Sequence, residues 1–224
     1  MKLAIQTVAS GVFGVLFFGV LLFAPAGTLR YWQAWVFIAI FLVATLGPSL
    51  YLAVRNPATL ARRMHGGPTA ETRPLQKVII TATFASVVVL TVVSALDHRF
   101  GWSHVPTAVI VVGDVLVVLG LVLAQAVILQ NNYAGASIRV EDEQPLVSTG
   151  LYGVVRHPMY SGALLMMFGM PLALDSYWGL LVTLLAVPIL VLRILDEESL
   201  LRTDLAGYDE YTRTTRYRIV PYVW

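Results

Sequence analysis

The sequence predicts an all-α protein, a polytopic transmembrane helical bundle of about six spans. Of its 224 residues, 58% are hydrophobic and only 12% are charged, whereas roughly 25% of the residues in a soluble domain are charged. Several uninterrupted apolar stretches are also long enough, or nearly so, to cross the ~30 Å hydrocarbon core of a bilayer. The chain therefore lacks the polar surface that a water-soluble domain requires.

Six apolar stretches are predicted as spans. The fifth has about 15 residues and reaches only ~22 Å as a helix, so five spans is the alternative. We read the first stretch as a retained helix and not a signal peptide, because it is long and lacks a small-residue cleavage site. A turn joins the last two stretches into a helical hairpin. The predicted spans are Leu3–Ala24, Tyr31–Val54, Gln76–Leu96, Val105–Gln130, Tyr160–Leu174 and Trp178–Leu195.

The distribution of cations indicates the orientation. With a cytoplasmic N-terminus, 13 of the 15 Lys and Arg residues fall on the cytoplasmic side, and only Arg30 and Arg99 fall outside. Because cytoplasmic loops are enriched in these cations, we expect both termini in the cytoplasm. That arrangement requires an even number of spans and favours six. The aromatic residues expected in an interfacial belt are Tyr31, Trp32, Trp35, Trp102, Tyr177 and Trp178.

Composition excludes several kinds of site. The chain has no cysteine, which excludes disulfides, cysteine-ligated zinc and thiol nucleophiles. No basic patch alternates with aromatic residues, so we expect no nucleic-acid partner. We also expect no metal site. Outside the spans, two polar segments remain: Arg55–Lys77, where Gly66–Pro68 should break any helix, and Asn131–Pro158.

Polar residues gather in the last third of the chain. Pro158 suits the first turn of a helix, where its missing N–H costs nothing, and this places His157 at the N-cap. The unpaired N–H groups of a helix start suit an anionic ligand. The alternative is that Arg156 is an interfacial anchor and His157 a solvated cap.

A second polar group follows the last apolar stretch. Arg193 and Glu197 share a helix face at a spacing of four residues, so they could form a structural ion pair. Charges at the end of a span are costly, however, and are often functional. The three acids of Asp196–Glu198 diverge by ~100° per residue, so at least one can face the bundle while another meets water.

These two regions together resemble a known family. LVSTGLYGVVRHPMYSG, followed about thirty residues later by RILDEESLLRTDLAGYDEYTRTTRYRIVPY, is similar to the isoprenylcysteine carboxyl methyltransferases. The wider group of membrane methyltransferases, including phospholipid N-methyltransferases, shares this general pattern. The resemblance covers Gln144 to Pro221, about a third of the chain. It combines G-x-Y-x-x-x-R-H-P-x-Y with R-x-x-x-E-E and a later pair of tyrosines.

The resemblance implies a site for S-adenosylmethionine. In the family, the segment that here is Gln144, Pro145, Leu146 and Val147 wraps the adenosyl group; Gln144 replaces a frequent histidine. Tyr152, His157, Pro158, Met159 and Tyr160 match cofactor-contacting residues, and Glu197 matches the cofactor-binding glutamate. Arg193 matches the arginine that approaches the substrate, and we assign it the catalytic role. A further contact falls near Ser137–Val140.

We therefore expect one domain, residues 1–224, with transmembrane helices in 1–130 and a cofactor-binding catalytic region with a cytoplasmic pocket in 131–224. The expected reaction moves a methyl group from S-adenosylmethionine to a lipophilic or lipidated acceptor, in first place a carboxylate, and leaves S-adenosylhomocysteine. Membrane lipids are the other expected partners.

Two alternatives remain open. One is an NADPH-dependent membrane reductase of the sterol type, for which Arg139, Arg202 and Arg216 are candidate cations for the 2′-phosphate. The other is a non-enzymatic membrane protein that binds a small molecule.

Overall fold

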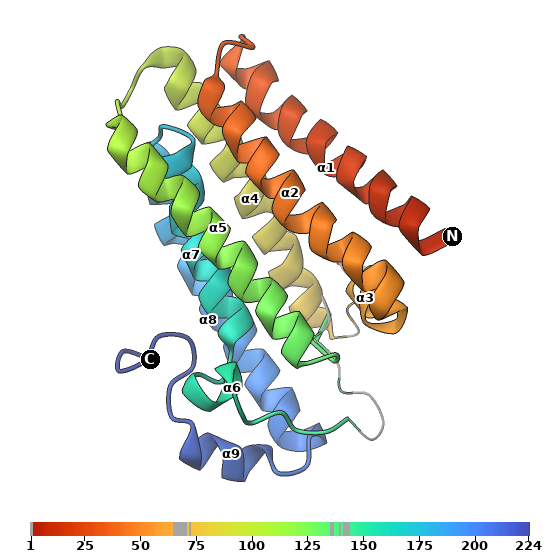
Figure 1. The fold of residues 1–224 in the computed structure, drawn as a ribbon. Coiled ribbons are helices and arrows are strands. Elements are labelled where there is room, and N and C mark those ends of the chain that lie inside the picture. Colours follow the sequence, from red (N-terminus) through yellow and green to blue (C-terminus); the bar gives the residue numbers. More distant parts are fainter. Residues whose placement is uncertain (1, 65–70, 72, 135–136, 139, 141–143) are drawn as a thin grey trace.

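The computed structural model describes residues 2–64, 71, 73–134, 137–138, 140 and 144–224. Every regular element within these residues is an α-helix (Figure 1), as the sequence predicts. The predicted break at Gly66–Pro68 and the candidate cation Arg139 lie outside the described residues. The helices are α1 (Lys2–Ala26), α2 (Trp32–Arg55), α3 (Pro57–Met64), α4 (Pro74–Phe100), α5 (Thr107–Gln130), α6 (Leu151–Val154), α7 (Pro158–Ala173), α8 (Trp178–Asp204) and α9 (Tyr208–Thr214).

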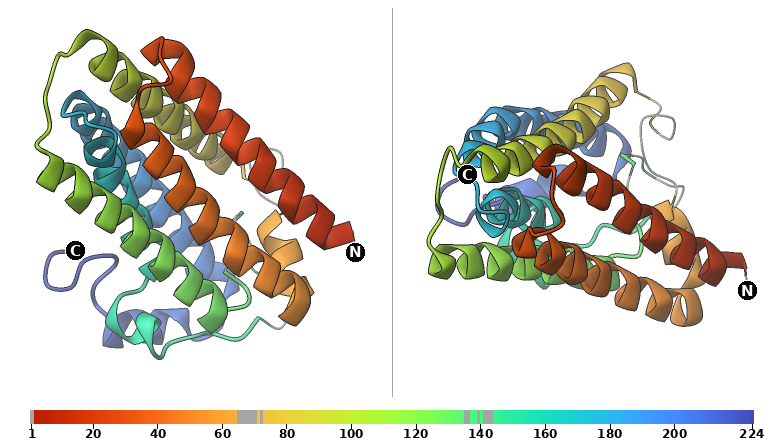
Figure 2. Two further views of the ribbon diagram at one scale, coloured as in Figure 1. Left: turned by 45° about the horizontal axis from the view of Figure 1, so that its top comes forward. Right: turned by 90° about the horizontal axis from the view of Figure 1, so that it is seen from above.

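Five helices, α1, α2, α4, α5 and α8, are long and apolar enough to cross a membrane. The sixth apolar helix, α7, has 16 residues and reaches about 24 Å. It contacts α2, α4, α5 and α8 and lies inside the bundle (Figure 2). The six apolar helices, α7 included, run in alternating directions (Figure 1), so α1 begins and α8 ends at the same end of the bundle. The predicted hairpin is present, because only residues 174–177 separate α7 from α8.

The outer surface of the bundle is apolar. Phe13, Val43 and Leu185 are 66%, 72% and 78% exposed, and many other large apolar side chains are exposed along the long helices. Such a surface is unfavourable in water, since each Å² of exposed apolar area costs about 25 cal/mol, but it suits a bilayer. Together with the five long apolar helices, it makes the chain an integral membrane protein.

Helices α5 and α7 approach closely along a line of glycines. Gly113 and Gly120 of α5 have the same spacing as Gly162 and Gly169 of α7. A Cβ on Gly120 would lie 2.5 Å from the carbonyl oxygen of Gly162, and a Cβ on Gly169 would lie 2.8 Å from that of Gly113. The two backbones are therefore in contact, as small residues allow between helices in membranes.

Buried polar side chains join the loops at the end of the bundle that lies opposite to the start of α1. Asp97 accepts hydrogen bonds from the backbone N–H and the hydroxyl of Ser103, at 2.7 and 2.6 Å, and from the hydroxyl of Ser176 at 2.7 Å. The hydroxyl of Tyr31 donates to the carbonyl of Leu174 at 2.5 Å. These bonds tie the start of α2 and the end of α4 to the α7–α8 hairpin.

The placement of Tyr31 in an interfacial belt is therefore wrong. Its side chain is fully buried because its hydroxyl reaches the backbone of the α7–α8 turn. The other aromatic residues of the expected belt are at least 41% exposed: Trp32, Trp35, Trp102, Tyr177 and Trp178.

The contact between α5 and α7 predicts opposite effects for two glycine substitutions. Gly120→Ala should lower stability, because overpacking against a backbone costs about 1–3 kcal/mol. Gly47→Ala in α2 is the matched control: a Cβ added there would meet nothing within 4 Å, and alanine favours a helix by about 0.5–1 kcal/mol. Thermal unfolding in detergent should show a lower Tm for the first variant and an equal or higher Tm for the second. A Gly120→Ala variant as stable as the wild type would contradict the close approach.

Candidate functional site

A cavity of about 270 Å³ lies at the end of the bundle where α5 ends and α7 begins. In Figure 1 the short helices α6 and α9 lie at this end. All eleven residues that the sequence analysis assigned to the site line this one cavity: Gln144, Pro145, Leu146, Val147, Tyr152, His157, Pro158, Met159, Tyr160, Arg193 and Glu197. The structure thus brings together segments that are about fifty residues apart in the chain.

The start of α7 has the predicted local structure. His157 is the N-cap, and Pro158 is at the start of the helix. The backbone N–H groups of Arg156 and His157 donate to the carbonyls of Tyr217 and Arg218, at 2.9 and 2.8 Å. The C-terminal segment therefore holds this short stretch in place beside the cavity.

Glu198 is buried and lies within ion-pair distance of three basic side chains. Its carboxylate lies 3.2 Å from Arg156 Nε, 3.2 Å from His157 Nε2 and 3.1 Å from Arg218 Nη2. Arg156 and His157 are 7% and 5% exposed, so the alternative of an interfacial anchor beside a solvated cap is wrong. Glu198 attracts both side chains inward, because a buried carboxylate is tolerated only where it is paired.

Arg193 and Glu197 are connected through a tyrosine. The hydroxyl of Tyr160 donates to Glu197 Oε2 at 2.6 Å and accepts from Arg193 Nε at 3.0 Å. Of the three consecutive acids, Asp196 and Glu198 are buried on the two sides of α8, and the half-buried Glu197 lines the cavity. None of them is fully exposed, so the bundle surrounds this end of α8 more completely than the sequence suggested.

The end of α5 positions Tyr152. The side chain of Gln130 donates to the carbonyl of Thr149 at 2.5 Å and accepts from the backbone N–H of Leu151 at 3.1 Å. Asn131 donates to the hydroxyl of Tyr152 at 3.1 Å. Burial raises the pKa of Tyr152, so its phenol stays protonated at neutral pH.

Two tyrosines of α9 also line the cavity, although the sequence analysis gave them no role. Burial raises the pKa of both Tyr208 and Tyr211, so both remain hydrogen-bond donors. Tyr211 donates to the carbonyl of Tyr152 at 2.7 Å. Within the described part of the chain, the buried hydroxyl of Tyr208 has no hydrogen-bond partner. The G-Y-x-x-Y spacing was the available signal for these residues.

Other lining residues come from parts of the chain that carried no clear motif. Arg63 belongs to α3, so the cavity is not confined to residues 131–224. Ser137 and Ile138 fall in the segment where the resemblance implied one more contact. The remaining unassigned lining residues are Asn131, Tyr133, Ala134, Arg156, Leu201 and Leu205.

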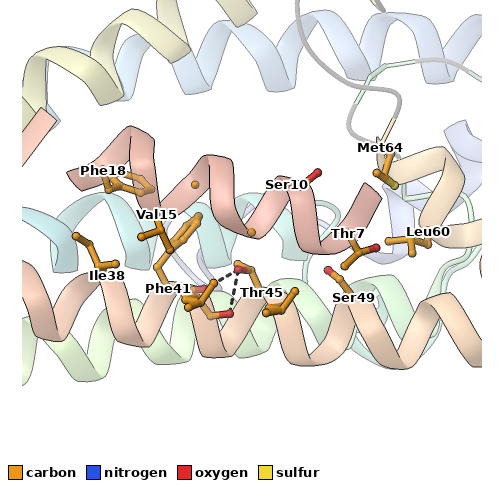
Figure 3. Close-up of a pocket in the computed structure, with 14 residues that line it drawn as sticks. Thr7, Ser10, Val15, Phe18, Ile38, Phe41, Thr45, Ser49, Leu60 and Met64 are labelled. Carbon is orange, nitrogen blue, oxygen red and sulfur yellow. Dashed lines mark hydrogen bonds between the residues drawn. The ribbon is translucent and has the colours of Figure 1, made fainter. Parts of the chain in front are cut away.

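A second cavity, of about 220 Å³, lies between α1, α2 and α3 (Figure 3). Its lining is apolar apart from the hydroxyls of Thr7, Ser10, Thr45 and Ser49, and it contains no charged residue. The cavity at the end of α5 is therefore the better candidate for a catalytic or binding site. Among the described residues, no cluster of three or more His, Asp or Glu could hold a metal ion.

A family match agrees with the motifs. Residues 108–205 match the family model described as phospholipid methyltransferase. A solved structure described as "Structure of the eukaryotic intramembrane Ras methyltransferase ICMT (isoprenylcysteine carboxyl methyltransferase) without a monobody" is similar at 16% identity and a TM-score of 0.49, covering 100% of this chain and 88% of that one. No curated protein matches the sequence. The family match agrees with the predicted resemblance: this chain is an integral membrane protein whose residues 108–205 resemble the phospholipid methyltransferases.

Proposed function

We propose that this protein transfers a methyl group from S-adenosylmethionine to the carboxylate of a lipophilic acceptor. The observation that carries the proposal is the gathering of all eleven expected residues around one cavity, with Arg193 and Glu197 joined through Tyr160. Because the motifs of these residues resemble those of the isoprenylcysteine carboxyl methyltransferases, an S-prenylated cysteine is the kind of acceptor we propose.

The cavity residues fit the proposed cofactor, which supplies an electrophilic methyl group on a sulfonium. Glu197 offers a carboxylate to a positively charged ligand. The N-terminal end of α7 presents the positive end of its helix dipole to a carboxylate. Pro145, Leu146 and Val147 provide an apolar wall for the adenosyl group. The unpartnered hydroxyl of Tyr208 is a further donor for a bound molecule.

The proposed mechanism relies on alignment. A carboxylate acceptor is already ionised at neutral pH, so no residue has to remove a proton. Arg193 orients the acceptor, and Tyr160 fixes Arg193 relative to Glu197. Exclusion of water and an in-line geometry then supply most of the rate enhancement. The acceptor's apolar part would enter from the bilayer, with the cavity at the cytoplasmic interface.

The two alternatives have less support. The family match favours methyl transfer over an NADPH-dependent reductase. Of the candidate cations for a 2′-phosphate, Arg202 is half-exposed and pairs with Asp209, and Arg216 is exposed. Thermal protection separates the hypotheses: S-adenosylhomocysteine should raise the Tm of the purified protein and NADPH should not. Protection by NADPH alone would favour the reductase, and protection by neither would favour a non-enzymatic protein.

Substitution of Glu197 should weaken cofactor binding. In calorimetry on the detergent-solubilised protein, S-adenosylhomocysteine should bind, and Glu197→Ala should lose about 1.5–3 kcal/mol of that binding, as expected for a hydrogen bond to a charged group. Glu210→Ala is the matched control, since Glu210 of α9 is highly exposed. Equal affinity of the Glu197→Ala variant and the wild type would remove Glu197 from the cofactor site.

Substitution of Arg193 should separate catalysis from cofactor binding. Arg193→Ala should lower turnover roughly 10- to 150-fold, the equivalent of about 1.5–3 kcal/mol, while the affinity for S-adenosylhomocysteine stays within a few-fold. Arg193→Lys should recover only part of this loss, because an ammonium lacks the planar fork of a guanidinium. Arg202→Ala, at a half-exposed ion pair, is the control.

Stability alone does not decide the role of Arg193, because it pairs with a buried carboxylate and either role predicts a lower Tm. The cofactor affinity decides: a parallel loss of turnover and of S-adenosylhomocysteine binding would indicate a purely structural residue. Normal turnover would exclude Arg193 from the site.

The proposed orientation is testable by single-cysteine labelling, since the chain has no native cysteine. Cysteines at Arg63 and at the C-terminus should react only with cytoplasmic reagent, and one at Arg99 only with external reagent. Glu143 would give a further cytoplasmic position outside the described residues. An external C-terminus would refute the six-span topology and restore five.

A further inference from the structure

Arg193 has a second acidic partner that the motifs do not include. Oε1 of Glu71 lies 3.3 Å from Arg193 Nη2 and 3.4 Å from Nη1. The carboxylate also accepts from the backbone N–H of Ile138, at 3.2 and 3.4 Å from its two oxygens. The Glu71 side chain is only 1% exposed. Glu71 therefore lies in the protein interior and connects the arginine to a wall of the cavity.

The guanidinium lies between the cavity and Glu71. Arg193 and Ile138 are among the residues that line the cavity, whereas Glu71 is not among the described lining residues. Gln76 of α4 accepts from Nη1 at 3.1 Å, and Tyr160 of α7 accepts from Nε at 3.0 Å. Glu71 and Gln76 thus hold the guanidinium from outside the cavity, while Tyr160, which lines the cavity, holds Nε; Glu71 is the acidic member of these three.

This arrangement matters for methylation of a carboxylate. An acceptor oxygen bonds to the methyl carbon as the carbon–sulfur bond breaks, and an ester and a neutral thioether form without proton transfer. The acceptor carboxylate loses negative charge along this path. An uncompensated cation beside it would stabilise the ground state more than the transition state, which lowers kcat even as it tightens binding.

We propose that Glu71 is a positioning residue of the acceptor site, which balances the charge of Arg193 and fixes its orientation from outside the cavity. The inference rests on the proposed function. With Glu71 in place, Arg193 directs the polar end of the acceptor by hydrogen bonds and not by net charge. Binding then discriminates weakly between an acidic and a neutral polar end, and the need for a nucleophilic oxygen confines the reaction to the acid.

The test uses two matched probes, N-acetyl-S-farnesylcysteine and its carboxamide, with the detergent-solubilised full chain in the presence of S-adenosylhomocysteine. The wild type should bind the two probes within about threefold of each other. Glu71→Gln keeps the shape of the side chain and removes its charge. It should bind the carboxylate about tenfold tighter, as expected for removing a nearby like charge, and leave the affinity for the carboxamide unchanged.

Turnover gives a second signature. For methylation of the carboxylate, Glu71→Gln should lower both KM and kcat, which a merely structural loss would not do. Glu71→Asp keeps the charge but shortens the side chain, so it should keep the wild-type ratio of probe affinities and lower only kcat. Glu210→Gln, at a highly exposed glutamate of α9, is the control and should resemble the wild type in both measurements.

The outcomes separate the two proposals. A folded Glu71→Gln protein that binds S-adenosylhomocysteine but keeps the wild-type ratio of probe affinities would overturn the role of Glu71 alone. If that variant does not fold, the wild type decides: a preference for the carboxylate above about tenfold, the factor that 1.4 kcal/mol represents, would overturn the proposal. A wild type that binds neither S-adenosylhomocysteine nor either probe would refute the proposed function, and this inference with it.

Discussion

The contact between α5 and α7 is the constraint on which the geometry of the cavity depends. Glycines at matching positions let the two backbones touch, and this fixes the start of α7 relative to the end of α5. Gln130 and Asn131 can then hold the turn before α6, while His157 and Tyr160 face the cavity from α7. A side chain between the helices would move these two groups apart, so residues in the middle of the membrane determine a site at its edge.

The second constraint is the cost of charge at the end of an apolar bundle. Buried charges are tolerated where they are paired with opposite charges, and two networks on α8 provide such pairs. Glu198 has Arg156, His157 and Arg218 as partners, and Arg193 has Glu71, Gln76 and Tyr160. Such networks hold polar groups in fixed orientations before any ligand arrives, which is the property that a reaction controlled by alignment requires. Stability and the proposed methyl transfer therefore place the same demand on these residues.

Much of the fold follows from local signals. Long apolar runs predict the helices, and a proline after His157 predicts the start of α7, because hydropathy and a missing N–H act within a few residues. The eleven residues that the motifs singled out line one cavity, since each motif carries its own local structure. The interaction partners of those residues were harder to predict from the sequence. Two of the three consecutive acids are buried and none is fully exposed, although one was expected to meet water.

By itself, then, the sequence determined that this is an all-helical membrane protein whose last third contains polar motifs that resemble those of membrane methyltransferases. Only the tertiary structure decided that Tyr31 lies inside the protein, that the glycines of α5 and α7 meet, and that Glu71 pairs with Arg193, 122 positions away in the chain. The physical reason is the range of the interactions. Helix formation and membrane insertion depend on neighbouring residues, whereas the pairing of buried charges depends on which helices pack together, and no single segment contains that information.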